Sequence, residues 1–180
     1  MLRILVISLL CALPAFAYPV KGVVGNMGDT KRTYPIKDAI VVWWTKYGVT
    51  GNVVEVHLFS KKLSAPERKS FSENLGPAGD LERVLDKNRA PNSALDSPRM
   101  VLQAFYGKQP RNLSQGPLPG GAAMWLSGPG NMDSGGLGGT IHLNGPLQQG
   151  TMVELSGEGS NGRVTWGITG SAPLIILSTR

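Results

Sequence analysis

Cysteine is almost absent from the sequence, because Cys11 is the only one among 180 residues. It lies in an N-terminal stretch that we expect to be removed, so we predict a mature chain without disulfides. Such a chain has to be stabilised by its hydrophobic core, even in a compartment that permits disulfides. Long apolar runs are also missing. Leu2 to Ala17 is shorter than the roughly 20 apolar residues of a spanning helix, so we expect a soluble product with no transmembrane segment after cleavage.

Signatures of catalysis and metal binding are scarce. The chain has two histidines, His57 and His142, and neither belongs to a metal-ligand motif such as HExxH. There is no G-x-S-x-G elbow and no phosphate-binding glycine loop. Basic residues cluster only as neighbouring pairs, so the net charge of +6 favours a solvated basic surface over a nucleic-acid site. We predict no metal, no cofactor, no catalytic residues and no specific nucleic acid.

The composition favours short strands over helices. Charged residues make up 17% and hydrophobic residues 41%, which is enough apolar material for a core and too little charge for a disordered chain. The 24 glycines and 13 prolines argue against helical bundles and coiled coils, and they indicate many turns. At this length we expect one domain, spanning residues 18–180.

Residues 1–17 have the pattern of a signal peptide. Arg3 gives a positive start, an apolar run follows from Ile4 to Leu13, and Ala15 to Ala17 supplies the small residues of a cleavage site. We therefore expect an exported protein, either periplasmic or extracellular, whose mature chain begins at Tyr18.

Segments of strand character recur along the rest of the chain. The first two are joined by a Gly-containing connection of hairpin length, which predicts an antiparallel pair. The later ones recur at roughly the 8 to 12 residue spacing of sandwiches and barrels. The predicted strands are Ala39 to Thr45, Val53 to Phe59, Arg99 to Tyr106, Ala122 to Leu126, Thr140 to Asn144, Thr151 to Ser156, Arg163 to Thr169 and Leu174 to Ser178.

One helix start has a clear mechanism. Ser64 can cap an early backbone N–H while Glu67 reaches back three residues to the cap. Asp80 can begin a second short helix. The expected fold is therefore mainly β: an antiparallel β-sandwich or a partly open barrel, with one or two short helices inserted between residues 64 and 88.

Glycine-rich stretches are interpreted as turns and loops. The region from Gln109 to Gly139, including Gly135-Gly136-Leu137-Gly138-Gly139, is expected to punctuate strands. Gly157 to Gly162 has the composition of a turn between antiparallel strands, and Asn161-Gly162 predicts a tight turn.

Polar and apolar residues alternate strictly in the second predicted strand. Val54, Val56 and Leu58 are expected to face the core, with Glu55 and His57 facing solvent. On that reading, replacing His57 by alanine changes stability by less than about 1 kcal/mol. An alternative is a hydrolase that uses Glu55, His57 and carboxylates on loops. It requires His57, His142 and a carboxylate to converge in one cleft.

Adjacent tryptophans form the most informative pair in the sequence. Trp43 and Trp44 lie in a strand, so their side chains point to opposite faces of the sheet. Either a helix or loop covers the outer face, or one indole is exposed as an aromatic platform for a sugar or partner. On the second reading, Trp43 and Trp44 are the candidate ligand-binding residues.

These observations favour a small exported, non-enzymatic β-sandwich protein that acts by binding or structural interaction at the cell envelope or outside the cell. A polysaccharide or an envelope component is the partner expected. The alternative is a hydrolase acting on an envelope or extracellular polymer. The sequence does not predict an oligomeric state.

Overall fold

The computed structural model describes residues 21–26, 33–47, 51–75, 99–106, 113, 122–128, 131–160 and 164–178. The expected signal peptide at residues 1–17, the second helix from Asp80 and the Asn161-Gly162 turn lie outside these residues. Within them the chain forms nine strands and one helix. They are β1 (Lys21–Asn26), β2 (Thr33–Ile36), β3 (Asp38–Tyr47), β4 (Gly51–Phe59), α1 (Ala65–Asn74), β5 (Arg99–Tyr106), β6 (Ala122–Gly128), β7 (Asn131–Asn144), β8 (Met152–Ser160) and β9 (Val164–Ser178).

The strands form one mixed sheet in the order β2-β1-β9-β3-β4-β5-β6-β7-β8, with a further pairing of β9 to β8. The structure is thus mainly β, as predicted, and the sheet is not closed into a barrel. The expectation of a purely antiparallel sheet is wrong, because β3 and β9 pair in parallel from Val41 with Leu174 to Thr45 with Ser178. The other pairings between described strands are antiparallel.

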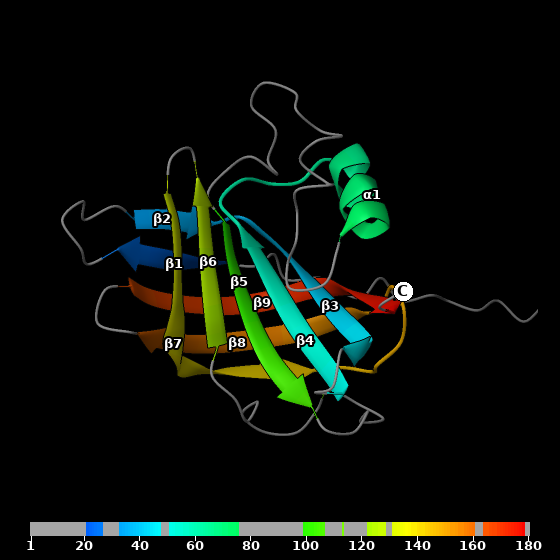
Figure 1. Ribbon diagram of the computed structural model, residues 1–180. Coiled ribbons are helices and arrows are strands. Elements are labelled where there is room, and N and C mark those ends of the chain that lie inside the picture. The colour runs from blue at the N-terminus through cyan, green and yellow to red at the C-terminus, as the bar shows by residue number, and fades with distance from the viewer. Residues whose placement is uncertain are drawn as a thin grey trace, which may run out of the picture.

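Strand β9 forms part of two regions of the sheet. Its first part lies between β1 and β8, and its second part lies beside β3. The strands β8 and β9 consequently cross the strands β3, β4 and β5 at a steep angle, whereas the first part of β7 runs beside β6 (Figure 1). The sequence predicts two separate strands here, Arg163 to Thr169 and Leu174 to Ser178, whereas the structure has one continuous strand.

Glycine-rich sequence forms strand where a loop is expected. β7 begins at Asn131 and includes Gly135 to Gly139, and β8 continues through Gly157 to Ser160. A Cβ atom at Gly139 would lie 2.8 Å from the Trp166 ring, and one at Gly157 would lie 2.5 Å from the Thr140 carbonyl oxygen. These glycines therefore allow close packing of backbone and indole, which a loop prediction does not anticipate.

The main core lies on one face of β3, β4 and β5. Val54, Val56 and Leu58 belong to it, as predicted, and side chains from β7, β8 and β9 pack against them. Alternate residues of β9, including Trp166 and Ile168, point into the same core. Their burial explains why the two groups of strands stay together across the crossing.

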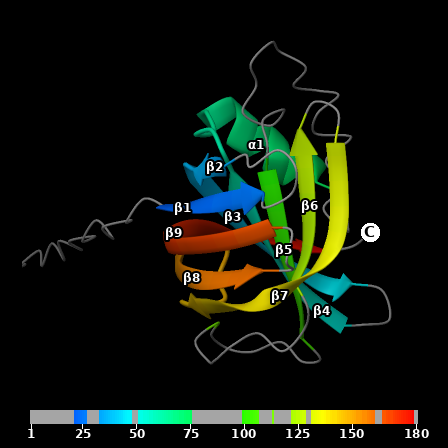
Figure 2. The same ribbon diagram turned by 90° about the vertical axis from the view of Figure 1, so that its left-hand side faces the viewer.

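A second core covers the opposite face of β3 and β4. It consists of Ile40, Val42, Trp44, Val53, Phe59, Leu63, Phe71, Leu75 and Ile175. Helix α1 provides the cover on this side, as the two orthogonal views show (Figures 1 and 2). The strands β3 and β4 are therefore buried on both faces, which accounts for the continuous apolar run in β3.

The start of α1 forms as the sequence predicts. Ser64 Oγ accepts a hydrogen bond from the Glu67 backbone N–H, and the Glu67 carboxylate accepts one from the Ser64 backbone N–H at 2.8 Å. Arg68 forms an ion pair with Asp38 at the start of β3, and Asp38 also accepts a hydrogen bond from the Leu63 backbone at 2.8 Å. The helix is thus fixed to the sheet at its N-terminal end.

Candidate functional site

The tandem tryptophans are both buried. Trp43 is 0% exposed in the main core and Trp44 is 2% exposed beneath α1. Their side chains lie on opposite faces, as strand geometry requires. The expectation of an exposed aromatic platform is wrong, because the β7–β9 strands cover one indole and the helix side covers the other. In this structure Trp43 and Trp44 have no ring face open to a ligand.

Glu55 and His57 are also fully buried, so their predicted exposure to solvent is wrong. Both lie on the face of β4 that α1 covers, and the Phe71 ring meets the His57 ring edge-on at 4.9 Å between centroids. The alternation in β4 correctly gives two faces. It could not show that α1, the helix that follows β4 in the chain, covers the second face.

A hydrogen-bonded cluster surrounds the Glu55 carboxylate. Trp44 Nε1 donates to Glu55 Oε2 at 2.9 Å, and Gln103 Nε2 donates to Oε1 at 2.6 Å. His57 Nε2 lies 3.0 Å from Oε2. Gln103 is the cross-strand partner of Glu55 in β5, so strand register places the amide beside the carboxylate. Buried charge is tolerated here because several donors satisfy it.

The environment favours an ionised Glu55 and a neutral His57. Burial alone would raise the pKa of Glu55, but hydrogen bonds from His57, Trp44 and Gln103 bring it below its usual value. Burial lowers the pKa of His57 by more than Glu55 raises it, and the charge of Arg99 lowers it further. The neutral ring therefore carries its proton on Nε2, facing Glu55. His57 Nδ1 is buried and has no hydrogen-bond partner among the described residues.

This cluster has the components of an acid–base pair but no opening to solvent in this structure. The hydrolase alternative requires Glu55 and His57 to converge with His142 in a cleft. His142 is exposed on β7, in the crossing strands, whereas His57 lies beneath α1. The structure thus brings Glu55 and His57 together but leaves His142 apart from them, on an exposed face of another strand.

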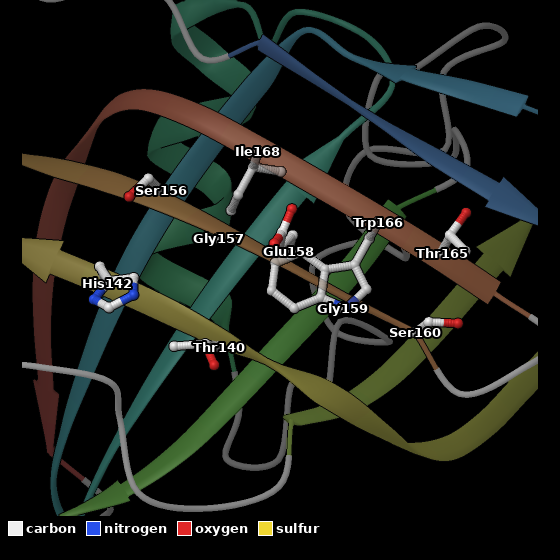
Figure 3. A pocket seen from close by; sticks show the side chains of 10 residues that line it. All are labelled: Thr140, His142, Ser156, Gly157, Glu158, Gly159, Ser160, Thr165, Trp166 and Ile168. Carbon is white, nitrogen blue, oxygen red and sulfur yellow. The ribbon is translucent and has the colours of Figure 1, made fainter.

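The accessible candidate site is a polar hollow on β7, β8 and β9. It has a volume of about 920 Å³ and is open to solvent. The residues that line it are Thr140, His142, Ser156, Gly157, Glu158, Gly159, Ser160, Thr165, Trp166 and Ile168 (Figure 3). We refer to it as the β7–β9 hollow.

Strand register explains the polar lining. Thr140 pairs with Glu158, His142 with Ser156, and Ser160 with Thr165 across the three neighbouring strands. These residues occupy the more exposed phase, while the alternate positions of β8 hold Gly157 and Gly159. Hydroxyl, imidazole and carboxylate groups therefore stand side by side on one face, and Trp166 and Ile168 add apolar surface to the lining.

The hollow can donate and accept hydrogen bonds over a broad surface. Each Ser or Thr hydroxyl does both, and a Glu158 carboxylate accepts only. Within the described residues, no three His, Cys, Asp or Glu side chains gather as a metal site. Sequence reasoning missed this surface because it took Gly157 to Ser160 as a turn. The sequence feature that could have indicated this surface is the alternation of polar residues with glycine from Ser156 to Ser160.

Comparison of the chain with protein-family models, with curated proteins and with solved structures finds no match. Among the described residues, no helix is long and apolar enough to cross a membrane.

Proposed function

We propose that the protein is exported and acts without catalysis, by binding a polysaccharide or another hydroxyl-rich envelope component in the β7–β9 hollow. The observation that carries this proposal is the hollow itself, a solvent-open site of about 920 Å³ lined mainly by polar residues. Its size lies within the range of about 300 to 1,000 Å³ that is usual for ligand sites.

The chemistry of the lining suits a hydroxyl-rich ligand. A sugar hydroxyl both donates and accepts hydrogen bonds, and so do the hydroxyls of Thr140, Ser156 and Thr165. Glu158 supplies an acceptor for ligand hydroxyls, and a hydrogen bond to a charged group is worth about 1.5 to 3 kcal/mol.

Binding can be tested by calorimetry with a panel of soluble neutral and acidic polysaccharides. For any polysaccharide that binds, Glu158→Gln should raise the dissociation constant by about 10-fold. Thr140→Val should also weaken binding, and both variants should keep the fold. Thr33→Val is the matched control, because Thr33 is an exposed strand threonine on β2 outside the hollow. Failure of every polysaccharide to bind, or equal effects of Thr33→Val and Thr140→Val, would contradict the proposal.

Export rests on the signal-peptide pattern in residues 1–17. Mass spectrometry of the secreted or periplasmic product should find Tyr18 at its N-terminus. An intact Met1 in that product, or retention of the chain in the cytoplasm, would contradict this part of the proposal.

A further inference from the structure

We propose that helix α1 is a detachable cover over Glu55 and His57, which lifts from the sheet on mild acidification while the strands stay folded. This goes beyond ligand binding in the β7–β9 hollow, because it concerns the opposite side of β3, β4 and β5. The proposal rests on how α1 is held and on what lies beneath it.

Within the part of the chain that the structure describes, few contacts hold α1 in place. It has 10 residues, and Phe71 is the only fully buried side chain within it. Helices of this length are not stable alone in water, so α1 depends on its seat on the sheet. Besides Phe71, the described part of that seat consists of the flanking Leu63 and Leu75 and the Arg68–Asp38 ion pair. By contrast, β3 and β4 are held by backbone ladders on both sides.

The His57 ring beneath α1 cannot accept a proton without an energetic cost while the helix is docked on the sheet, which we call the closed state. His57 Nε2 faces Glu55, and the second nitrogen, Nδ1, has no partner among the described residues. Protonation would place a new N–H donor on Nδ1 with no described acceptor, and an unmet buried donor is costly. When α1 lifts, water can accept that hydrogen bond. Glu55 is on the same strand as His57, so its attraction for the charged ring persists in both states.

The charged groups around His57 either oppose its protonation or have the same effect on it whether α1 is docked or lifted. Arg99 on β5 opposes a positive charge on His57. Arg68 on α1 is paired with Asp38 on β3, and Glu55 on β4 keeps its donors Trp44 and Gln103, neither of which belongs to α1. Lifting the helix therefore changes the surroundings of His57 more than those of Glu55.

The sign of the pH dependence follows from proton linkage. Burial lowers the pKa of His57 in the closed state below its usual value of about 6.5, which the open state approaches. Below about pH 6.5 the open state then binds more protons. The equilibrium constant for opening should rise by up to about 10-fold for each pH unit below that value, until the closed state also takes up the proton.

Hydrogen exchange measured by mass spectrometry at pH 7, 6 and 5, corrected for intrinsic exchange, can test the proposal. Amides in residues 65–74 should lose protection as the pH falls, while those of β3 and β4 keep theirs. His57→Gln retains an N–H donor for Glu55 and should remove the pH dependence from α1. His142→Gln is the matched control, because it replaces the other histidine of the chain, which is exposed, and it should behave as the parent protein does.

Three results would overturn the proposal: loss of protection in α1 and β4 together, a pH dependence that persists in His57→Gln, or no pH dependence at all. A second variant keeps the test valid if His57→Gln does not fold. Arg68→Ala loosens α1 without touching His57, so the NMR titration midpoint of the His57 ring should move up towards 6.5. An unchanged midpoint in a folded Arg68→Ala protein would also overturn it.

Discussion

The two faces of β3 and β4 are equally buried but are built differently. On the face towards β7, β8 and β9, the side chains are apolar and come from strands that share backbone ladders. On the face towards α1, a carboxylate, an imidazole and an amide lie among apolar residues, and the cover is a short helix. Burial alone therefore does not define a core. The first face can support the fold, whereas the second face combines stability with a group that responds to pH.

The largest expected effect is on the apolar face. Val56→Asp places a carboxylate among side chains of the main core with no partner to receive it, so we expect loss of the folded protein. The cost should be about 4 kcal/mol or more. Soluble yield and far-UV circular dichroism will measure it. A folded Val56→Asp protein would show that this face is not the main core.

The next effect compares the two indoles. Trp43→Ala should lower the free energy of unfolding by about 3 to 5 kcal/mol, because it leaves a large cavity in the main core. Trp44→Phe keeps most of the ring volume but removes the hydrogen bond to Glu55, and it should cost about 1 to 3 kcal/mol. Urea denaturation of both variants tests the comparison. A larger loss for Trp44→Phe than for Trp43→Ala would reverse the ranking of the two faces.

His57→Ala should cost about 2 to 3 kcal/mol at pH 7, rather than the value below 1 kcal/mol that solvent exposure would predict. The variant removes a hydrogen bond to a buried carboxylate and the ring that contacts Phe71. Denaturant titrations at pH 7 and pH 5 should show a smaller penalty at pH 5, because the parent protein loses stability as His57 becomes protonated. His142→Ala, at an exposed position, should change stability by less than about 0.5 kcal/mol.

The smallest expected effect is at the end of the helix. Ser64→Ala removes the hydroxyl that caps α1 and should cost about 1 kcal/mol. The loss should appear as faster hydrogen exchange in residues 65–74 more than as a change in the strands. Equal changes in α1 and β3 would show that the helix and the sheet unfold as one unit.

The sequence predicts local features of this fold well. The bounds of β5 agree fully, the capping box at Ser64 forms, and Val54, Val56 and Leu58 face the main core as their alternation indicates. These features depend on neighbours in the chain, so a period or a cap is enough to predict them. The opposite phases of Trp43 and Trp44 follow for the same reason.

The sequence does not predict burial or strand pairing where these depend on a segment that is distant in the chain. Glu55 and His57 have the phase of solvent-facing residues, and only the docking of Phe71 shows that they are buried. The N-terminal strands β1 and β2 are missed, and so is the parallel pairing of β3 with β9, because no local pattern specifies a partner that far along the chain. The β7–β9 hollow is missed because its glycines resemble a turn.

The position of β9 has a consequence for the timing of folding. Val41 in β3 pairs with Leu174 in β9, and β1 and β8 also pair with β9. Three parts of the sheet therefore stay incomplete until the ribosome has synthesised residues 164–178. Contacts between segments so far apart form slowly, and a chain released before β9 would expose unpaired strand edges that favour aggregation.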